Sequence, residues 1–179
     1  MDTALLLTAM DFAARKHRGQ RRKDPEKSPY INHPIAVAQL VAGVGGVLDH
    51  VTILAAILHD TVEDTDTSFE ELEAIFGRDV RDVVAEVTDD KTLPKDDRKC
   101  LQIEHASHAS VRAKIVKLAD KTCNVIDVNN SPPADWSVER RLEFLAWSSS
   151  VVAGCRGANA ALEAHFDTEV AIARARLVS

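Results

Sequence analysis

The segment from residue 51 to residue 65, VTILAAILHDTVEDT, restricts the fold more than any other part of the chain. Eight residues with a single polar interruption are followed at once by His59, Asp60, Glu63 and Asp64. Charged groups at the end of a buried helix are costly unless something cationic pairs with them. A spacing of three or four residues puts these four side chains on one side of a helix. The segment therefore predicts a core helix whose end holds a divalent cation with an activated water.

Apolar residues at helical spacing recur along the whole chain, and no alternating strand pattern of useful length appears. Helices are expected at residues 4–18, 34–43, 50–65, 67–76, 78–89, 94–103, 112–128, 138–154 and 158–177. The residues that suit their ends are Asn32 or His33, Asp49, Thr67 or Ser68, Pro94, Ser110 and Ser137 at starts, and Gly19, Gly43 and Gly77 at stops. The sequence thus predicts an all-α fold, a compact multi-helix bundle with a metal site between its central helices.

Length and charge limit the partners that such a chain can have. Its 179 residues suffice to bury a core as one domain without disulfides. A net charge of −6 argues against nucleic acid as a partner. The longest apolar run is far shorter than the roughly 18 to 20 residues of a membrane helix, and three widely spaced cysteines suit a reducing cytosol. We expect a single cytoplasmic domain over residues 1–179 that binds neither nucleic acid nor membrane.

Two further residues complete a candidate metal site. A His-Asp pair alone is more often a structural contact, but His33 follows a long polar loop at a helix start, and Asp120 ends the apolar run KIVKLAD. Two imidazoles and two carboxylates suit Mn²⁺, Fe²⁺ or Zn²⁺ better than Ca²⁺. Such an ion lowers the pKa of a bound water and polarises a phosphoryl oxygen. Glu63 and Asp64 lie one turn past the His-Asp pair, within reach of that water, and need not bind the ion.

Four motifs in a fixed order resemble a known family: RRKDPEKSPYINHPIAVA, AAILHDTVEDT, EVTDDKTLPK and VKLADKTCNV. With His33, His59, Asp60 and Asp120 in this order, the chain resembles the HD metal-dependent phosphohydrolase superfamily. It is most similar to the hydrolase domain of the Rel/SpoT alarmone enzymes, and above all to the small stand-alone hydrolases related to the metazoan SpoT homologue. The resemblance covers nearly the whole chain and implies a single HD-type hydrolase domain without synthetase or regulatory domains.

The resemblance also implies a site and a reaction. One Mn²⁺ ion, with Fe²⁺ or Zn²⁺ as substitutes, would be held by His33, His59, Asp60 and Asp120. The substrate would be ppGpp or pppGpp, cleaved at its 3′-diphosphate to GDP or GTP and pyrophosphate. Glu63 and Asp64 would orient or deprotonate the attacking water. The residues expected to bind substrate are Arg22, Lys23 and Asn124, with Lys95, Lys117, Lys121 and Arg140 as further candidates for phosphate.

The basic candidates can also be interpreted as surface residues without a binding role. Arg22 and Lys23 could belong to a solvated loop, and a charged residue on a helix is usually just solvated. His105 and His108 have ligand-like spacing but lie in a polar stretch, so we expect them at the surface and predict no second metal. Ile126 stands where the relatives usually have arginine, which puts the rim of the substrate pocket in question.

Two other functions compete with alarmone hydrolysis. Animal relatives are associated with removal of the 2′-phosphate of NADPH, and other HD enzymes attack different nucleotides. A non-catalytic nucleotide-binding module is the third alternative, and the retention of all four ligands together with Glu63 and Asp64 speaks against it. The sequence does not separate ppGpp from NADPH, nor does it indicate an oligomeric state.

Overall fold

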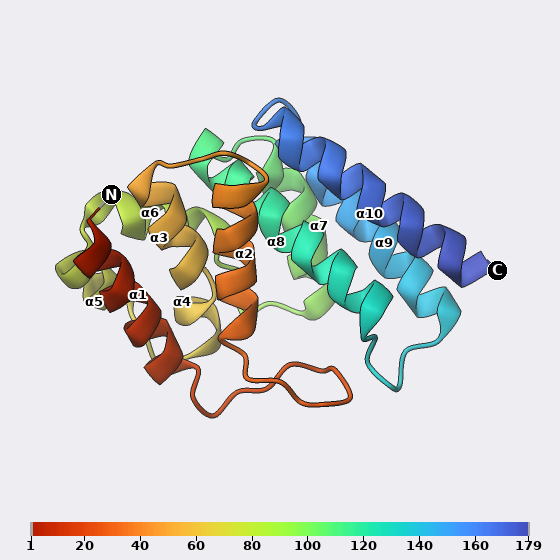
Figure 1. The fold of residues 1–179 in the computed structure, drawn as a ribbon, viewed down its shortest axis with the longest axis horizontal. Helices are drawn as coiled ribbons and strands as arrows, with labels where there is room; N and C mark the ends of the chain where they lie inside the picture. The colour runs from red at the N-terminus through yellow and green to blue at the C-terminus, as the bar shows by residue number, and fades with distance from the viewer. Residues whose placement is uncertain (1, 179) are drawn as a thin grey trace.

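Helices make up all the regular secondary structure of residues 2–178, the part of the chain that this computed structural model describes. The all-α prediction is therefore confirmed, and Figure 1 shows the arrangement. The elements are α1 (Thr3–Lys16), α2 (Asn32–Gly43), α3 (His50–Leu58), α4 (Thr61–Asp64), α5 (Phe69–Phe76), α6 (Arg78–Val87), α7 (Lys95–Ala106), α8 (Val111–Asn130), α9 (Val138–Cys155) and α10 (Ala160–Val178).

Side-chain caps begin several of these helices where the sequence places them. Asp49, Ser68, Ser110 and Ser137 each accept a hydrogen bond from a backbone N–H in the first turn that follows. Gly77 separates α5 from α6 with a φ of +85°, a conformation that side-chain-bearing residues rarely adopt. The ends of these elements are thus encoded locally.

The predicted single helix over residues 50–65 is wrong. α3 ends at Leu58, and Asp60 precedes the short helix α4 with φ −96° and ψ −3°. The hydroxyl of Thr61 donates to the Leu58 carbonyl at 2.6 Å, which satisfies a backbone group that the break frees. His59 and Asp60 therefore occupy the junction between two helices, and Glu63 and Asp64 belong to the second.

The start of α2 also differs from expectation. α2 begins at Asn32, and its N-cap position is Ile31, without a side-chain cap. The preceding loop supplies the missing acceptors, because the carbonyls of Pro29 and Tyr30 accept from the N–H groups of Asn32 and His33. A prediction based on side-chain caps does not see such backbone acceptors.

Two buried helices, α3 and α8, form the centre of the molecule. Every residue from Val51 to Leu58 is buried. α3 packs against α1, α2, α6 and α8, while α8 also packs against α2, α9 and α10 (Figure 1). Within residues 2–178, no helix has the length and apolar character needed to cross a bilayer. This packing puts the C-terminal end of α3 beside the middle of α8.

Two connections outside the core position the site. The loop over residues 17–31 runs along the lower edge of Figure 1 and folds back on itself, because Arg21 and Pro29 form an isolated bridge. At the other side of the molecule, α9 approaches the end of α7 closely. A Cβ atom at Gly154 would lie only 2.8 Å from the Cβ of Ala106 and from the N of Ser107. Glycine is therefore needed for α7 and α9 to meet there.

Candidate active site

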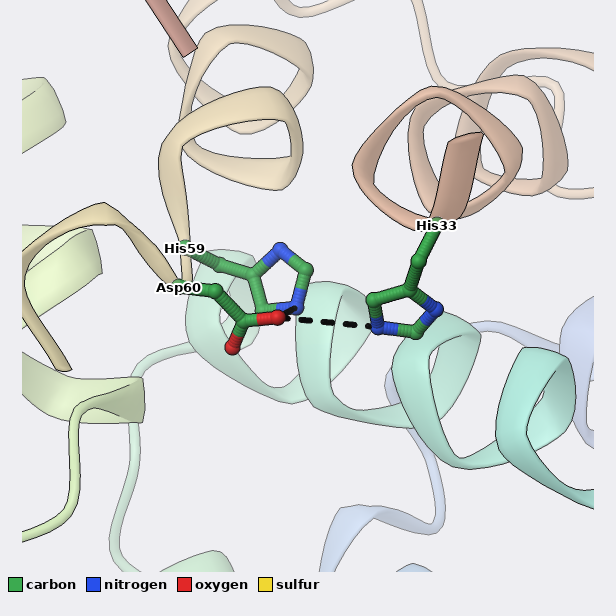
Figure 2. Close-up of side chains that lie close together, drawn as sticks. All are labelled: His33, His59 and Asp60. Carbon is green, nitrogen blue, oxygen red and sulfur yellow. Dashed lines mark ion pairs between the residues drawn. The ribbon is translucent and has the colours of Figure 1, made fainter. Parts of the chain in front are cut away.

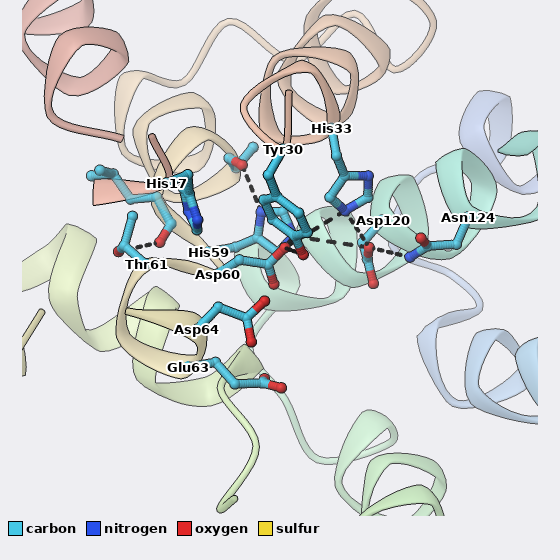
Figure 3. A network of polar contacts seen from close by, with 12 residues as sticks. His17, Tyr30, His33, His59, Asp60, Thr61, Glu63, Asp64, Asp120 and Asn124 are labelled. Atoms are coloured by element: carbon cyan, nitrogen blue, oxygen red, sulfur yellow. Dashed lines mark hydrogen bonds and ion pairs between the residues drawn. The ribbon is translucent and has the colours of Figure 1, made fainter. Parts of the chain in front are cut away.

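The four predicted ligands converge from three parts of the fold. His33 comes from the first turn of α2, His59 and Asp60 from the α3–α4 junction, and Asp120 from the middle of α8 (Figure 3). His33 Nε2 lies 3.7 Å from Asp60 Oδ2 and 3.1 Å from Asp120 Oδ1. His59 Nε2 lies 3.1 Å and 3.8 Å from the same two oxygens. Ligand atoms of His33, His59 and Asp60 all fall within 4.8 Å of one another (Figure 2).

The hydrogen bonds of His59 test whether this cluster fits a cation. His59 Nδ1 bonds to the carbonyl of Ala56 at 2.8 Å, which requires the proton on Nδ1, so the neutral ring that a metal ion would bind has its lone pair on Nε2. Nε2 is buried, has no hydrogen bond, and faces the Asp60 and Asp120 carboxylates. A lone pair aimed at two carboxylates is unfavourable unless positive charge lies between them. The donor set therefore fits a divalent metal ion bound by nitrogen and oxygen.

The pKa values of the histidine and carboxyl groups also show strong electrostatic coupling within the cluster. Burial lowers the pKa of His59, but the Asp60 and Asp120 carboxylates and the bond to the Ala56 carbonyl together outweigh this effect and raise that pKa to about 9. Burial raises the pKa of Asp60, while the charges of His59 and His33 hold it well below its usual range. The pKa of Asp120 is likewise depressed, against the effect of burial, by Lys121 and His33. Positive charge among these carboxylates thus keeps them ionised, which is the state in which a carboxylate binds a metal ion.

Neighbouring side chains fix the orientation of both carboxylates. The Tyr30 hydroxyl donates to Asp60 Oδ2 at 2.7 Å. Asn124 Nδ2 donates to Asp120 Oδ1 at 2.6 Å, and Lys121 Nζ donates to Asp120 Oδ2 at 3.0 Å. Such outer contacts hold ligands in place before an ion binds.

Glu63 and Asp64 lie beside the ligand cluster and contact the loop between α6 and α7 (Figure 3). Glu63 Oε2 accepts from the backbone N–H of Asp89 at 3.0 Å, and the Asp64 carboxylate pairs with Lys91. Burial, followed by the charge of Asp89, raises the pKa of Glu63 to about 7, although the N–H bond opposes this. Two adjacent carboxylates are thus held in different surroundings.

Three adjoining cavities share walls at this point. The candidate ligands, Glu63 and Asp64 line a small cavity of about 160 Å³. A second cavity, of about 500 Å³, extends from Asn124 and Tyr30 past Arg22 and Lys23 to Trp136 and Phe144. A third, of about 700 Å³, extends from Glu63 between α7 and the start of α9. A small cavity lined by the candidate metal ligands and joined to two larger cavities suits a ligand that has several parts.

The predicted basic residues divide among these cavities. Arg22 donates to Asn124 Oδ1 at 3.1 Å and to Asp127 Oδ2 at 2.5 Å, and Lys23 is exposed between the two larger cavities. Lys95 and Arg140 are exposed and line only the largest cavity.

Lys117 and Lys121 differ from the other basic candidates. The expectation that helix lysines are solvated is wrong for both, because each is buried and lines the smallest cavity. Both therefore lie on the same cavity wall as Asp120.

Three residues prove peripheral to this site. Ile126 lines a separate cavity of about 310 Å³ behind His33, and it does not line the 500 Å³ cavity. His105 and His108 are exposed, as expected.

A comparison with protein families decides the classification. A family model described as "HD domain" matches residues 9–144. The chain belongs to the HD domain family. Enzymes with this domain depend on a divalent metal ion, in agreement with the nitrogen and oxygen donors of the buried cluster.

Several curated relatives of this HD domain are hydrolases of matching length. "Guanosine-3′,5′-bis(diphosphate) 3′-pyrophosphohydrolase MESH1" of Xenopus tropicalis is 57% identical over 166 residues, which are 93% of each chain. The protein of the same name from Drosophila melanogaster is 48% identical over 165 residues, or 92% of each chain. A solved structure titled "A metazoan ortholog of SpoT hydrolyzes ppGpp and plays a role in starvation responses" has a TM-score of 0.92 and 46% identity, covering 98% of this chain and 97% of that one. The resemblance and the enzyme class, a hydrolase, are thus confirmed.

Several residues without a predicted role also contact this HD-domain site. Gln20 accepts from His17 and donates to the Asp64 carbonyl, and the buried ring of His17 lies 4.9 Å from that of Tyr30. Lys91 could have been found from the sequence, because it lies within the family-like motif EVTDDKTLPK. Arg98, whose guanidinium lies 4.0 Å from Glu63, had no signal because nothing in its local sequence differs from a surface helix.

Proposed function

We propose that this HD-domain protein is a Mn²⁺-dependent guanosine-3′,5′-bis(diphosphate) 3′-pyrophosphohydrolase. It would degrade ppGpp and pppGpp to GDP and GTP, with release of pyrophosphate. One observation carries the proposal: relatives named for this activity match at 57% identity over 93% of both chains. The convergence of the candidate ligands, Glu63 and Asp64 on one cavity supports it independently.

The metal would be held by His33, His59, Asp60 and Asp120. A divalent ion supplies Lewis-acid polarisation of a phosphoryl oxygen and a lowered pKa of water. Mixed imidazole and carboxylate donors favour Mn²⁺ or a similar transition ion over Ca²⁺. Tyr30 and Asn124 hold the two carboxylates through the hydrogen bonds described above and would keep them in place to bind the ion.

The reaction is transfer of a diphosphate from the ribose to water. A new bond joins the water oxygen to the proximal phosphorus of the 3′-diphosphate, and the bond from that phosphorus to the ribose 3′-oxygen breaks. The water loses a proton and the 3′-oxygen gains one. We assign proton acceptance to Glu63, because a pKa of about 7 makes it a better base than an ordinary glutamate near neutral pH. Asp64, paired with Lys91, orients the water.

The nucleoside would occupy the 500 Å³ cavity. Tyr30, Trp136 and Phe144 supply aromatic wall there, and Arg22 and Lys23 supply positive charge. Lys95 and Arg140 would bind phosphate in the 700 Å³ cavity, where the Arg140 guanidinium lies 4.7 Å above the Trp136 ring. Asn124 lies between the 500 Å³ cavity and the ligand cluster and would contact the ribose.

The decisive assay offers ppGpp and NADPH separately to the purified protein with Mn²⁺ and resolves the products by ion exchange. Pyrophosphate and GDP from ppGpp are expected, and EDTA should abolish them. Glu63→Ala should lose at least 100-fold in kcat, in line with general base catalysis, while Glu104→Ala, an exposed residue of α7, should match the wild type.

Two results would overturn the proposal. Phosphate released from NADPH without turnover of ppGpp would establish the 2′-phosphatase alternative. Binding of ppGpp without any hydrolysis, by a protein with a full equivalent of Mn²⁺, would establish a nucleotide-binding module.

A further inference from the structure

Lys117 is a buried lysine without a partner. Its residue surface is 5% exposed, and its ammonium makes no hydrogen bond or ion pair with any of the residues 2–178. Lys121, one turn further along α8, is equally buried but is satisfied, since it donates to Asp120 and lies 4.8 Å above the Trp147 ring. An ammonium on a largely buried side chain is costly when the protein gives it no partner.

Lys117 lies where a ligand can reach it. It lines the 160 Å³ cavity together with the candidate metal ligands and Glu63. Asn124, Asp120 and Lys117 follow one another at spacings of four and three residues, so they lie along one face of α8. At 1.5 Å per residue, Asp120 is about 6 Å from Asn124 and about 4.5 Å from Lys117 along the helix axis.

The surrounding charges do not neutralise this ammonium. Asp89 and Asp120 are the acidic groups that act on it, but Gln102 occupies Asp89 through a hydrogen bond, and Asp120 already pairs with Lys121. Lys121 itself repels Lys117. Burial is the main effect on its pKa, which it lowers. Residues 2–178 of the folded protein thus provide no anion that pairs with Lys117, so a bound anion can take that place.

We propose that Lys117 binds the distal phosphate of the diphosphate that the enzyme transfers to water. This inference rests on the proposed function. The substrate would lie along α8 with the ribose near Asn124, the proximal phosphate at the ligand cluster and the distal phosphate at Lys117. The order of these groups on the helix matches the order of the groups in a nucleoside 3′-diphosphate.

This arrangement has a consequence for specificity. A phosphate monoester, such as the 2′-phosphate of NADPH, ends at the ligand cluster and leaves Lys117 without a partner. A diphosphate ester gains one charge-assisted hydrogen bond there, which corresponds to roughly 10- to 100-fold in affinity. Lys117 therefore selects diphosphate esters over monoesters.

Binding of the inorganic product tests this without catalysis. The Mn²⁺-loaded protein is titrated with pyrophosphate and, separately, with phosphate by calorimetry, with free Mn²⁺ held constant because pyrophosphate binds the ion itself. The wild type should prefer pyrophosphate by at least tenfold. Lys117→Met should reduce that preference to below threefold, whereas Lys114→Met, a lysine on the same helix that bonds to the Ser107 carbonyl, should preserve it.

Stability of the metal-free protein gives a second readout. Because the unpaired ammonium is costly, Lys117→Met and Lys117→Gln should unfold at an equal or higher temperature than the wild type. If Lys117 instead stabilised the fold, both substitutions would lower the unfolding temperature. Destabilisation of both variants, or an unchanged pyrophosphate preference in Lys117→Met, overturns the inference. Failure of the wild type to hydrolyse ppGpp refutes the proposed function instead, and the two failures are separable because this test does not measure turnover.

Discussion

Glu63 shows how the environment of one residue prepares it for chemistry. Its side chain is 19% exposed beside the ligand cluster, and its Oε2 accepts a hydrogen bond from a backbone N–H of the next loop. Burial raises its pKa from 4.5 to about 7, so the group changes protonation near neutral pH. General acids and bases work best when their pKa lies near the working pH.

The raised pKa of Glu63 predicts a pH dependence of stability. Between pH 4.5 and about 7 the folded protein keeps the proton that the unfolded chain has lost. The free energy of unfolding should therefore fall as pH rises through this window, by an amount on the order of 2 to 3 kcal/mol from this residue. Urea titrations of the metal-free wild type and Glu63→Gln at several pH values measure the difference between the two curves.

The difference should disappear at pH 4 and grow toward pH 7, in favour of Glu63→Gln. Glu104→Gln, at an exposed position, is the matched control and should follow the wild type. Parallel curves for Glu63→Gln and the wild type would show that burial does not perturb this carboxyl.

Tyr30 predicts an effect on metal binding without contact to the ion. Its buried hydroxyl donates to Asp60, and burial raises its pKa, so it remains a donor at neutral pH. Tyr30→Phe removes only this hydrogen bond and should weaken Mn²⁺ binding by roughly 10- to 100-fold. Competition with a fluorescent chelator measures the affinity. An unchanged dissociation constant would mean that Asp60 needs no support.

Individual residues also show what the sequence could and could not predict. The four candidate ligands stood out because each lies at a recognisable place in its own segment. The burial of Lys117 and Lys121 could not be predicted, because it depends on α8 being covered by α9 and α10, which a local pattern does not encode. Tyr30 and Gln20 lay in the polar loop, where only tertiary contacts reveal their partners.

At the level of elements, boundaries followed local chemistry where a side chain caps a helix. The break after Leu58 did not, because TVED has no glycine or proline and continues the helical pattern. One contact at the break is local, because the Thr61 hydroxyl replaces a backbone donor, but the other is tertiary, because the distant Gln20 donates to the carbonyl of Asp64. After the break, Glu63 and Asp64 contact the α6–α7 loop and still line the same cavity as the candidate ligands.

Asp49 connects the two central helices and predicts a larger effect than an ordinary cap. It accepts from the N–H and hydroxyl of Thr52 at the start of α3 and from Arg112 at the start of α8. Asp49→Ala should cost about 1 to 2 kcal/mol of unfolding free energy in urea. Ser68→Ala, which removes a simple cap of α5, should cost no more than about 1 kcal/mol.

Metal affinity should be the same in Asp49→Ala as in the wild type. Asp49 lies ten residues before His59, which is about 15 Å along α3. Loss of Mn²⁺ from this variant would mean that the start of α3 controls the geometry at its end.

For the whole molecule, the metal ion should act as part of the core. The candidate ligands come from α2, α8 and the α3–α4 junction, so an ion joins segments that are far apart in sequence. At 100 times the dissociation constant, Mn²⁺ should add about 2.7 kcal/mol. Thermal unfolding with Mn²⁺ should therefore lie roughly 5 to 11 °C above that with EDTA.

The exposed histidines provide the control. A double substitution of His105 and His108 by alanine should preserve the full shift, whereas Asp120→Asn should lose most of it. An equal shift in Asp120→Asn would remove Asp120 from the ligand set.

The close contact at Gly154 allows the entrance of the 700 Å³ cavity to change without any substitution among the residues that line it. α7 and α9 are fixed to each other there, at their C-terminal ends, and their N-terminal ends border the 700 Å³ cavity. Lys95 and Arg140 lie about 16 Å and 21 Å from the contact, so a small change of the helix angle there moves them much further. A substitution at this one half-buried position, distant from the cavity lining, can thus change the shape of the cavity entrance.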